Sequence, residues 1–410
     1  MNHLLNTIKN SFQHYIKGVL MTFICCCGTL STWAQSNNLD TNNVANAPRY
    51  EIGIITCGTG EDLYASFGHA AIRVLDKVTN AEEVYNYGMF NFHEPNFVGK
   101  FVKGSLMYYV AKEPFLSFLP NYKSENRSVV EQTLNLNDAD AQKVVRFLEE
   151  NLQPENKYYP YDFVKDNCAT RIEDLFIKVF GDRLQFSPVV GNSGMTFRNA
   201  MDQQMLNKHW LRFGIDLALG SYVDQAMTEK ESMFLPNLLM QGFSAATLDG
   251  KRLVSEQQVI YDAPAQNNAY VPNTPMWLTI AILVLTILVF SLAPFKPIRN
   301  AWAMSLLIIT GLLGCFFLFM WLGTRHAATS FNFNFLWAMP LNLVVAFTIF
   351  KPRKWHRTYA MVSIGAILMS VILHLSQVQQ LPIVELIGFL MTMTYVHLYI
   401  LRRANTLLGK

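Results

Sequence analysis

The sequence predicts an exported α+β domain followed by an all-α transmembrane domain of five helices. Nearly all acidic residues of the 410-residue chain lie in its first 270 positions, where short β-rich runs, tight turns and amphipathic segments alternate. Long apolar windows fill most of the rest. We expect an exported domain over 35–272, a membrane domain over 273–402 and a cytoplasmic tail over 403–410. The net charge of +3 gives no indication of nucleic-acid binding.

The N-terminus has the pattern of an export signal. Lys9 and Lys17 precede a short apolar run, and the sequence STWAQS follows it. The run is short for a membrane span, and the small residues before Gln35 resemble a cleavage site, so we predict a signal peptide over 1–34. An uncleaved anchor is the alternative, and it would leave the next domain on the same side of the membrane.

Five windows are long and apolar enough for transmembrane helices. They cover 276–293, 302–322, 332–350, 359–376 and 383–401. Nine basic residues lie in the loops after the first, third and fifth windows, whereas the alternate loops carry only Arg325. The positive-inside rule therefore places the odd-numbered loops in the cytoplasm and the domain before the first window outside. A multi-pass membrane protein with its N-terminal domain outside the cytoplasm is expected.

Polar residues gather at the predicted outer ends of these windows. Arg325, His326, Asn332 and Asn334 precede or open the third window, and Glu385 opens the fifth. Ionisable groups inside a membrane cost about 2.5–3.5 kcal/mol each even on the insertion scale, so such a cluster indicates a cavity or a substrate contact. Helix caps and interface anchors are the alternative.

A predicted hairpin carries a candidate catalytic base. The runs GHAAIRVLD and EVYNYGMF flank the polar segment KVTNAE. Side chains alternate along a strand, so Ala70, Ile72 and Val74 share an apolar face and His69 points away from it. If the hairpin folds symmetrically about its turn, Asn86 comes within reach of His69. The other histidines considered, His93 and His209, lie in a turn-like and a helical context and favour structural roles.

A candidate nucleophile stands at a helix start. Apolar residues recur at helical spacing from Ile172 to Phe180, and Asp166 or Asn167 is a suitable N-cap, which puts Cys168 in the first turn. Backbone N–H groups and the helix dipole stabilise a thiolate there. A second helix is expected over 138–151.

The cysteine count supports a free thiol. Three of the six cysteines lie in the predicted signal, which leaves Cys57, Cys168 and Cys315. An odd count in an exported protein is not a disulfide framework. Cys57 ends an apolar strand before Gly58, which suits a buried residue better than an activated one, so Cys168 is the preferred nucleophile.

Several roles stay open from the residues alone. Arg171 and Asp174 could orient the catalytic helix through a salt bridge or contact a phosphate, and Asp162 and Asp166 are similarly open. For the segment MFLPNLL over 233–239 the residues leave three alternatives open: a lid, an interfacial segment or an ordinary helix.

These motifs resemble a known family, the Lnb-type proteins of the Bacteroides group. The resemblance rests on ITCGTGEDLYASFGHAAIRV, VYNYGMFNF, ENRSVVEQTLNL, YYPYDFVKDNCATRIED, WLRFGIDLALGSYVD and TRHAATSFNFNFLWAMP. It covers the chain from about residue 48 to the end. It implies a permuted papain-like exported domain, similar to lecithin:retinol acyltransferase, with His69 as base and Cys168 as nucleophile. That family's usual third histidine is absent here, and Asn86 takes its place.

The resemblance also implies a bacterial inner-membrane protein with its catalytic domain in the periplasm. The activity that it implies is that of a lipoprotein N-acyltransferase. Such an enzyme moves an acyl chain from a phospholipid through a cysteine thioester to the α-amino group of the diacylglyceryl-cysteine of a lipoprotein, without a metal, ATP or another cofactor. The expected partners are therefore the membrane, a phospholipid donor and a diacylated lipoprotein acceptor. The residues expected to contact these substrates are Asn167, Arg171, Arg325, His326, Asn332 and Asn334.

Two other functions remain open at this point. A membrane-tethered amidase or peptidase acting on cell-wall peptide would use the same cysteine and histidine, but it leaves the polar outer ends of the spans without a role. A non-catalytic envelope scaffold would make Cys168 an inert structural residue.

Overall fold

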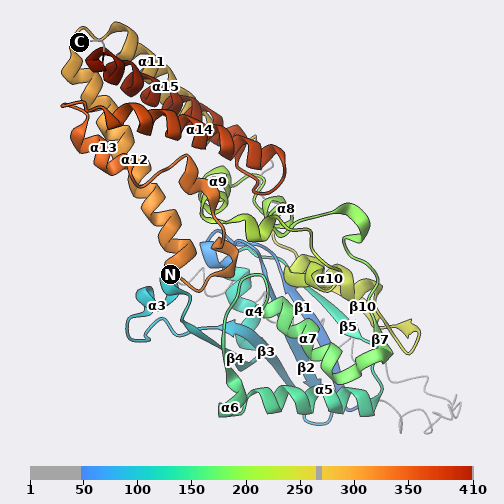
Figure 1. Ribbon diagram of the computed structural model, residues 1–410. Helices are drawn as coiled ribbons and strands as arrows, with labels where there is room; N and C mark the ends of the chain where they lie inside the picture. The colour runs from blue at the N-terminus through green and yellow to red at the C-terminus, as the bar shows by residue number, and fades with distance from the viewer. Residues whose placement is uncertain (1–47, 265–269, 409–410) are drawn as a thin grey trace, which may run out of the picture. The chain divides into compact units, whose positions relative to one another are not determined.

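An antiparallel sheet of seven strands organises the first part of the chain in this computed structural model, which describes residues 48–264 and 270–408 (Figure 1). The predicted signal peptide lies outside the described residues. The strand order is β10-β5-β1-β2-β3-β4-β6. The strands are β1 (Tyr50–Cys57), β2 (His69–Asp76), β3 (Ala81–Met89), β4 (Met107–Pro114), β5 (Val129–Leu134), β6 (Tyr158–Pro160) and β10 (Val254–Tyr261). A small second sheet joins β7 (Leu184–Gln185), β8 (Thr247–Leu248) and β9 (Lys251–Arg252).

Helices and short 3-10 turns fill the connections of this domain. The helices are α3 (Phe97–Lys103), α4 (Phe115–Ser124), α5 (Asp138–Asn151), α6 (Pro154–Lys157), α7 (Cys168–Phe180), α8 (Phe197–Gln204), α9 (His209–Ala218) and α10 (Pro236–Ala245). The 3-10 turns are η1 (Leu63–Ala65), η2 (Gly181–Arg183), η3 (Gly191–Ser193), η4 (Ser221–Asp224) and η5 (Glu231–Phe234).

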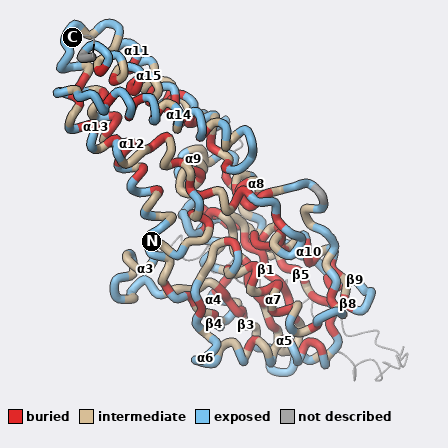
Figure 2. Tube along the Cα trace, in the orientation of Figure 1, coloured by how far each residue is buried: buried red, intermediate tan, exposed pale blue. Residues whose placement is uncertain are grey.

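The central strands are covered on both faces. Ile72 on β2 belongs to a large apolar core shared with α5, α7 and α10. Ala71, on the opposite face of the same strand, packs in a second core with Phe118 of α4. Burial of alternate side chains on both faces explains why β1, β2 and β5 are among the most buried segments (Figure 2).

The predicted hairpin and both predicted helices are confirmed. Strands β2 and β3 pair antiparallel from Ile72–Tyr85 to Asp76–Ala81. Helix α5 begins after Asn137, whose side chain accepts a hydrogen bond from the backbone of Asp140. The segment over 233–239 is buried: η5 and α10 contribute apolar side chains to the domain core, so it is an ordinary packed segment.

The membrane region contains four helices long and apolar enough to span a bilayer among the described residues. These are α11 (Thr274–Leu292), α12 (Lys296–Gly323), α14 (Trp355–Leu375) and α15 (Ile383–Leu408). The expectation of five spanning helices is therefore not met. The window over 332–350 is broken into a 3-10 turn, η7 (Phe333–Leu336), and a short helix, α13 (Asn342–Thr348), after another 3-10 turn, η6 (Ala327–Thr329).

Local chemistry explains the break. Pro340 lacks a backbone N–H, and asparagine side chains compete with helical hydrogen bonding. Asn332 does so by accepting from the backbone N–H of Asn334 at 3.0 Å. The apolar composition of the window predicts a helix because a few residues such as Asn332 and Pro340 change its mean hydropathy very little.

The broken segment still crosses the bundle. At one end, the backbone N–H of Phe333 donates to Gln379, in the α14–α15 connection, at 2.6 Å. At the other end, the carbonyl of Ile349 accepts from Arg403, near the end of α15, at 2.7 Å. Non-helical backbone at membrane depth is tolerated where protein surrounds it, and Trp337 in this segment is 1% exposed.

Polar contacts join the exported domain to the membrane region. Arg212 of α9 forms a salt bridge with Glu385 at the start of α15, and Asn273 donates to the same carboxylate at 2.8 Å. Asn332 donates to the carbonyls of Leu217 and Ala218 at the end of α9, at 2.9 and 3.0 Å. These bonds satisfy buried polar groups that would otherwise be costly.

Candidate active site

Cys168 occupies the first turn of α7, on a rigid helix start. The side chain of Asn167 accepts from the backbone N–H groups of Ala169 and Thr170, at 2.8 and 3.1 Å. Its amide also donates to the carbonyls of Phe163 and Phe234, at 2.7 and 2.9 Å. Asn167 is buried and fully occupied in this way, so its observed role is to cap the helix and fix the position of the thiol.

His69 begins β2 and faces that helix. The β2–β3 ladder starts only at Ile72, so the first residues of β2 lie beyond it. Helix α7 packs against β2, and a Cβ on Gly88, two residues after Asn86, would stand 3.8 Å from Cys168 Cβ, so His69 and Cys168 share this opening and shift each other's pKa. Both residues are partly exposed, which leaves the pair accessible to a substrate.

Asn86 of β3 orients the His69 ring. Its Oδ1 atom lies 2.5 Å from His69 Nε2, and its Nδ2 group donates to Glu113 of β4 at 3.2 Å. Because the amide nitrogen faces a carboxylate, Oδ1 must face the ring and His69 Nε2 must donate to it. His69 Nδ1 is then the nitrogen left to exchange a proton with Cys168.

Charges within the site favour an ion pair. Burial raises the pKa of Cys168, but the positive charge and hydrogen bond of His69, with the backbone N–H groups of Ala70 and Ala169, outweigh burial and lower it. Burial lowers the pKa of His69, but the Cys168 charge and the bonds to Cys168 and Asn86 raise it overall. The thiolate of Cys168 and the imidazolium of His69 therefore stabilise each other.

Backbone N–H groups near Cys168 also stabilise its thiolate. The backbone N–H groups of Ala70, at the start of β2, and Ala169, in α7, both help to lower the pKa of Cys168, although the N–H of Ala169 donates to the Asn167 side chain. Gly88 lies opposite with φ of 87°, and a Cβ there would stand 3.8 Å from Cys168 Cβ. The site thus combines a thiol, an imidazole, a side-chain amide and a helix start, which are the kinds of group that nucleophilic catalysis uses.

Sequence reasoning did not identify Glu113 or the tyrosines around the site. The Tyr122 ring stacks on His69 with 6.4 Å between centroids. Tyr161 and Cys168 pack against the same apolar core, and burial, followed by the charge of Cys168, raises the pKa of Tyr161 well above its ordinary value. Aromatic enrichment in YYPYDF was the available signal for Tyr161, whereas Glu113 enters through strand pairing that has no local signature.

The alternative nucleophile and bases lie in other settings. Cys57 is 1% exposed, and burial raises its pKa far above the ordinary value, so it is poorly suited to attack. His93 is exposed in the connection between β3 and α3. His209 Nε2 lies 3.1 Å from the carbonyl of Val271.

The other residues predicted to contact substrate have structural partners. Arg171 pairs with Asp166, and its guanidinium lies 3.8 Å from the centroid of the Tyr159 ring. The remaining four connect the membrane region to the exported domain. Arg325 donates its backbone N–H to Lys103, His326 Nε2 contacts the carbonyls of Phe101 and Val102, and Asn332 and Asn334 bond to the end of α9.

No set of three or more His, Cys, Asp or Glu side chains is arranged to hold a metal ion within residues 48–264 and 270–408.

The fold and site describe a membrane protein with an exported α/β domain that carries a cysteine–histidine pair. Two family descriptions match the chain: the Lnb N-terminal periplasmic domain over residues 38–202 and the Lnb transmembrane domain over residues 266–405. The chain therefore belongs to the Lnb family, whose domains indicate an acyltransferase acting in lipoprotein N-acylation. No curated protein and no solved structure matches it.

Proposed function

We propose that this protein is a lipoprotein N-acyltransferase that uses Cys168 as its nucleophile. The observation that carries the proposal is the contact of Cys168 with His69, itself held by Asn86, in a chain of the Lnb family. A helix-start cysteine packed against a histidine-bearing antiparallel strand is also the arrangement expected of a permuted papain-like domain.

The first half-reaction forms a thioester. The Cys168 thiolate attacks the ester carbonyl carbon of a phospholipid, and the backbone N–H of Ala70, together with the positive end of the α7 dipole, would stabilise the oxyanion. The C–O bond then breaks, and His69 gives its proton to the departing alkoxide. Lysophospholipid leaves, and the acyl group stays on sulfur.

The second half-reaction forms the amide. The α-amino group of a diacylglyceryl-cysteine attacks the thioester carbonyl, and His69 takes the proton released by the amine. Collapse of the intermediate breaks the C–S bond, which restores the thiolate and imidazolium. Asn86 keeps Nδ1 of His69 directed at the reaction in both halves.

A series of aromatic contacts supports a lipid donor. From Tyr161, which packs against the same core as Cys168, the contacts lead toward α3 through rings whose centroids lie 4.3–6.1 Å apart: Tyr108, Phe90, Phe97 and Phe101. The end of α3 is joined to His326, just beyond the predicted outer end of α12. Apolar residues exposed on α3, such as Val98 at 70%, would therefore face the outer leaflet and guide an acyl chain to the site.

Intact-mass analysis of the purified full-length protein tests the proposal. Incubation with phospholipid should add one acyl group to the wild type and to Cys315→Ser, a control that removes an exposed thiol of α12. Cys168→Ser and His69→Ala should remain unmodified. A diacylated lipopeptide should then remove the acyl group and become triacylated.

Two results would refute the proposal. One is an unchanged yield of triacylated lipopeptide with Cys168→Ser. The other is cleavage of cell-wall peptide by the wild type without any acyl adduct, which would indicate an amidase.

A further inference from the structure

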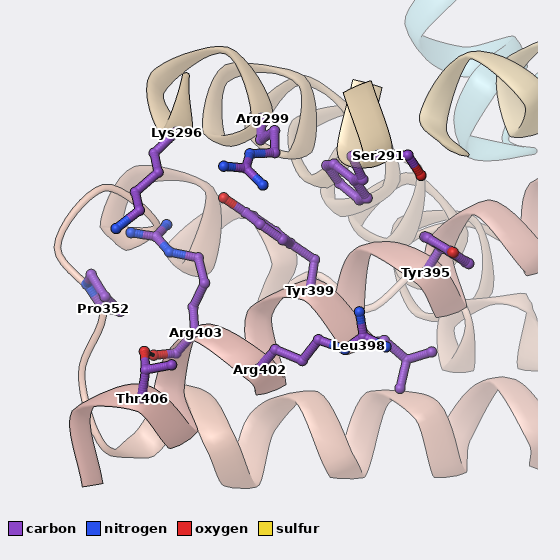
Figure 3. A pocket seen from close by; sticks show the side chains of 11 residues that line it. Ser291, Lys296, Arg299, Pro352, Tyr395, Leu398, Tyr399, Arg402, Arg403 and Thr406 are labelled. Carbon is purple, nitrogen blue, oxygen red and sulfur yellow. Dashed lines mark hydrogen bonds between the residues drawn. The ribbon is translucent and has the colours of Figure 1, made fainter. Parts of the chain in front are cut away.

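A basic pocket lies at the end of the membrane region that the loop charges predict to be cytoplasmic (Figure 3). It has a volume of about 590 Å³ and opens between the end of α11, the start of α12, the end of α15 and the α13–α14 connection. Its lining residues are Phe290, Ser291, Lys296, Arg299, Pro352, Tyr395, Leu398, Tyr399, Arg402, Arg403 and Thr406.

The lining is strongly cationic. Lys296, Arg299, Arg402 and Arg403 contribute four positive charges, and no carboxylate is among the lining residues. Figure 3 shows the ends of Lys296, Arg299 and Arg403 directed into the same space. Like charges repel at this range unless an anion separates them, so the pocket is electrostatically suited to an anionic group.

One donor in the pocket has no partner in the protein. The Nε atom of Arg299 is enclosed, yet it makes no hydrogen bond within the described residues. A buried donor without a partner costs about 1–3 kcal/mol. The end of the same guanidinium is directed into the pocket (Figure 3), where a phosphate would accept from its accessible N–H groups, because guanidinium groups bind phosphate through paired N–H donors.

The floor of the pocket is fixed in advance. Arg403 Nη1 donates to Asn300 at 2.5 Å and to the carbonyl of Ile349 at 2.7 Å, and the Tyr399 hydroxyl donates to Asn300 at 2.8 Å. The Phe290 and Tyr399 rings stack with 4.6 Å between centroids. These contacts join three helices and hold Arg403 and Tyr399 in place before a ligand binds.

We propose that this pocket binds the phosphate of an anionic phospholipid headgroup from the cytoplasmic leaflet. The basic side chains would contact phosphate, and Phe290, Tyr395 and Leu398 would contact the glycerol and the first acyl carbons. Basic pockets between helices at this face of a membrane bind such lipids. Free phosphate could bind the same basic side chains, but it has no apolar group to contact Phe290, Tyr395 and Leu398. This lipid site is separate from Cys168 and does not depend on the proposed acyl transfer.

Native mass spectrometry of the full-length protein in detergent tests the site with phosphatidylglycerol, phosphatidylcholine or inorganic phosphate. We expect saturable retention of phosphatidylglycerol by the wild type, with at least about tenfold weaker retention in Arg299→Gln/Arg402→Gln, since two charge-assisted contacts are lost. The matched control is Lys354→Gln/Arg357→Gln, which removes two exposed charges from the same predicted face outside the pocket. Lys296→Gln, a single change at an exposed position, should give a smaller loss.

Each outcome has a definite meaning. Equal retention by the wild type and both pocket variants overturns the site. If phosphatidylcholine is retained as strongly as phosphatidylglycerol, the proposed selectivity for anionic lipid is wrong. If inorganic phosphate displaces the lipid at equal concentration, the proposal that the ligand is a lipid is wrong. Thermal unfolding without added lipid checks the folding of each variant. If the double variant fails to fold, Lys296→Gln decides: unchanged retention overturns the proposal.

Discussion

Asn86 Oδ1 accepts from His69 Nε2 at 2.5 Å, and this bond fixes which ring nitrogen faces Cys168. Asn86→Ala should therefore lower kcat/KM for acyl transfer by about 10- to 100-fold, as expected when a bond to a charged group worth about 1.5–3 kcal/mol is lost. The measurement is the initial rate of lipopeptide triacylation. Glu113→Gln, which keeps a hydrogen-bond acceptor for Asn86, should cost less. Equal rates for Asn86→Ala and the wild type would contradict the orienting role.

The ion pair predicts an unusual pH dependence. The pKa of Cys168 is lowered and that of His69 is raised, because the thiolate and the imidazolium stabilise each other. As pH falls through the lowered Cys168 pKa the thiolate is lost, and as pH rises through the raised His69 pKa the imidazolium is lost. Alkylation of Cys168 at pH 7 should thus be faster than that of an ordinary thiol, of which only a few per cent is ionised there.

Peptide mass spectrometry after timed iodoacetamide treatment measures this reactivity. Cys57 serves as an internal reference that should stay unmodified because it is buried. His69→Ala should shift the Cys168 profile to higher pH, since the cation that stabilises the thiolate is removed. An identical profile in His69→Ala would show that the helix start alone sets the reactivity.

The positions of the candidate catalytic residues were predictable where local rules decide them. Strand alternation and the turn length brought His69 and Asn86 together, and the capping preference of Asn167 put Cys168 at the start of a helix. Glu113 and Tyr161 were not predictable in the same way. They approach the site through β3–β4 pairing and through packing of residues far apart in the chain, neither of which has a pattern in the local sequence.

The membrane region shows the corresponding limit of a hydropathy window. The four continuous helices lie where apolar runs are uninterrupted. The third window was wrong as a helix because Asn332, Asn334 and Pro340 alter backbone hydrogen bonding without much changing mean hydropathy. The predicted alternation of loops nevertheless remains consistent with the structure, since the broken segment crosses the bundle.

Arg198 should be essential for the stability of the exported domain. It is 1% exposed and bonds to Asp224 at 2.7 Å and Asp216 at 3.0 Å. Arg198→Ala leaves two carboxylates buried without their cation, which should lower the free energy of unfolding by about 3–5 kcal/mol. Thermal unfolding in detergent measures the loss. Arg146→Ala, an exposed position on α5, should change stability by less than about 0.5 kcal/mol.

Val98 tests whether α3 meets the membrane. Val98→Asp should slow thioester formation from phospholipid in bilayers, because a carboxylate resists entry into the interface. Acylation of Cys168 by a short water-soluble ester should be unaffected, which separates lipid access from chemistry. Leu116→Asp on α4, where the wild-type side chain is 83% exposed, is the matched control and should leave both rates unchanged. Equal slowing with both esters would mean that Val98→Asp disturbs the site itself.

Gly314 of α12 should be required for the broken third segment to pack. A Cβ at this position would overlap the carbonyl oxygen of Ala338, so the helix can approach the non-helical backbone only through glycine. Gly365 of α14 is the matched control, since a Cβ there meets no atom within 4 Å. Gly→Ala in a helix interior is favourable by about 0.5–1 kcal/mol when space allows. Gly365→Ala should therefore raise or preserve the thermal unfolding midpoint in detergent, whereas Gly314→Ala should lower it. Equal midpoints for the two variants would show that the broken third segment can move away from α12 without loss of stability. Close packing against α12 would then not explain why this segment tolerates non-helical backbone.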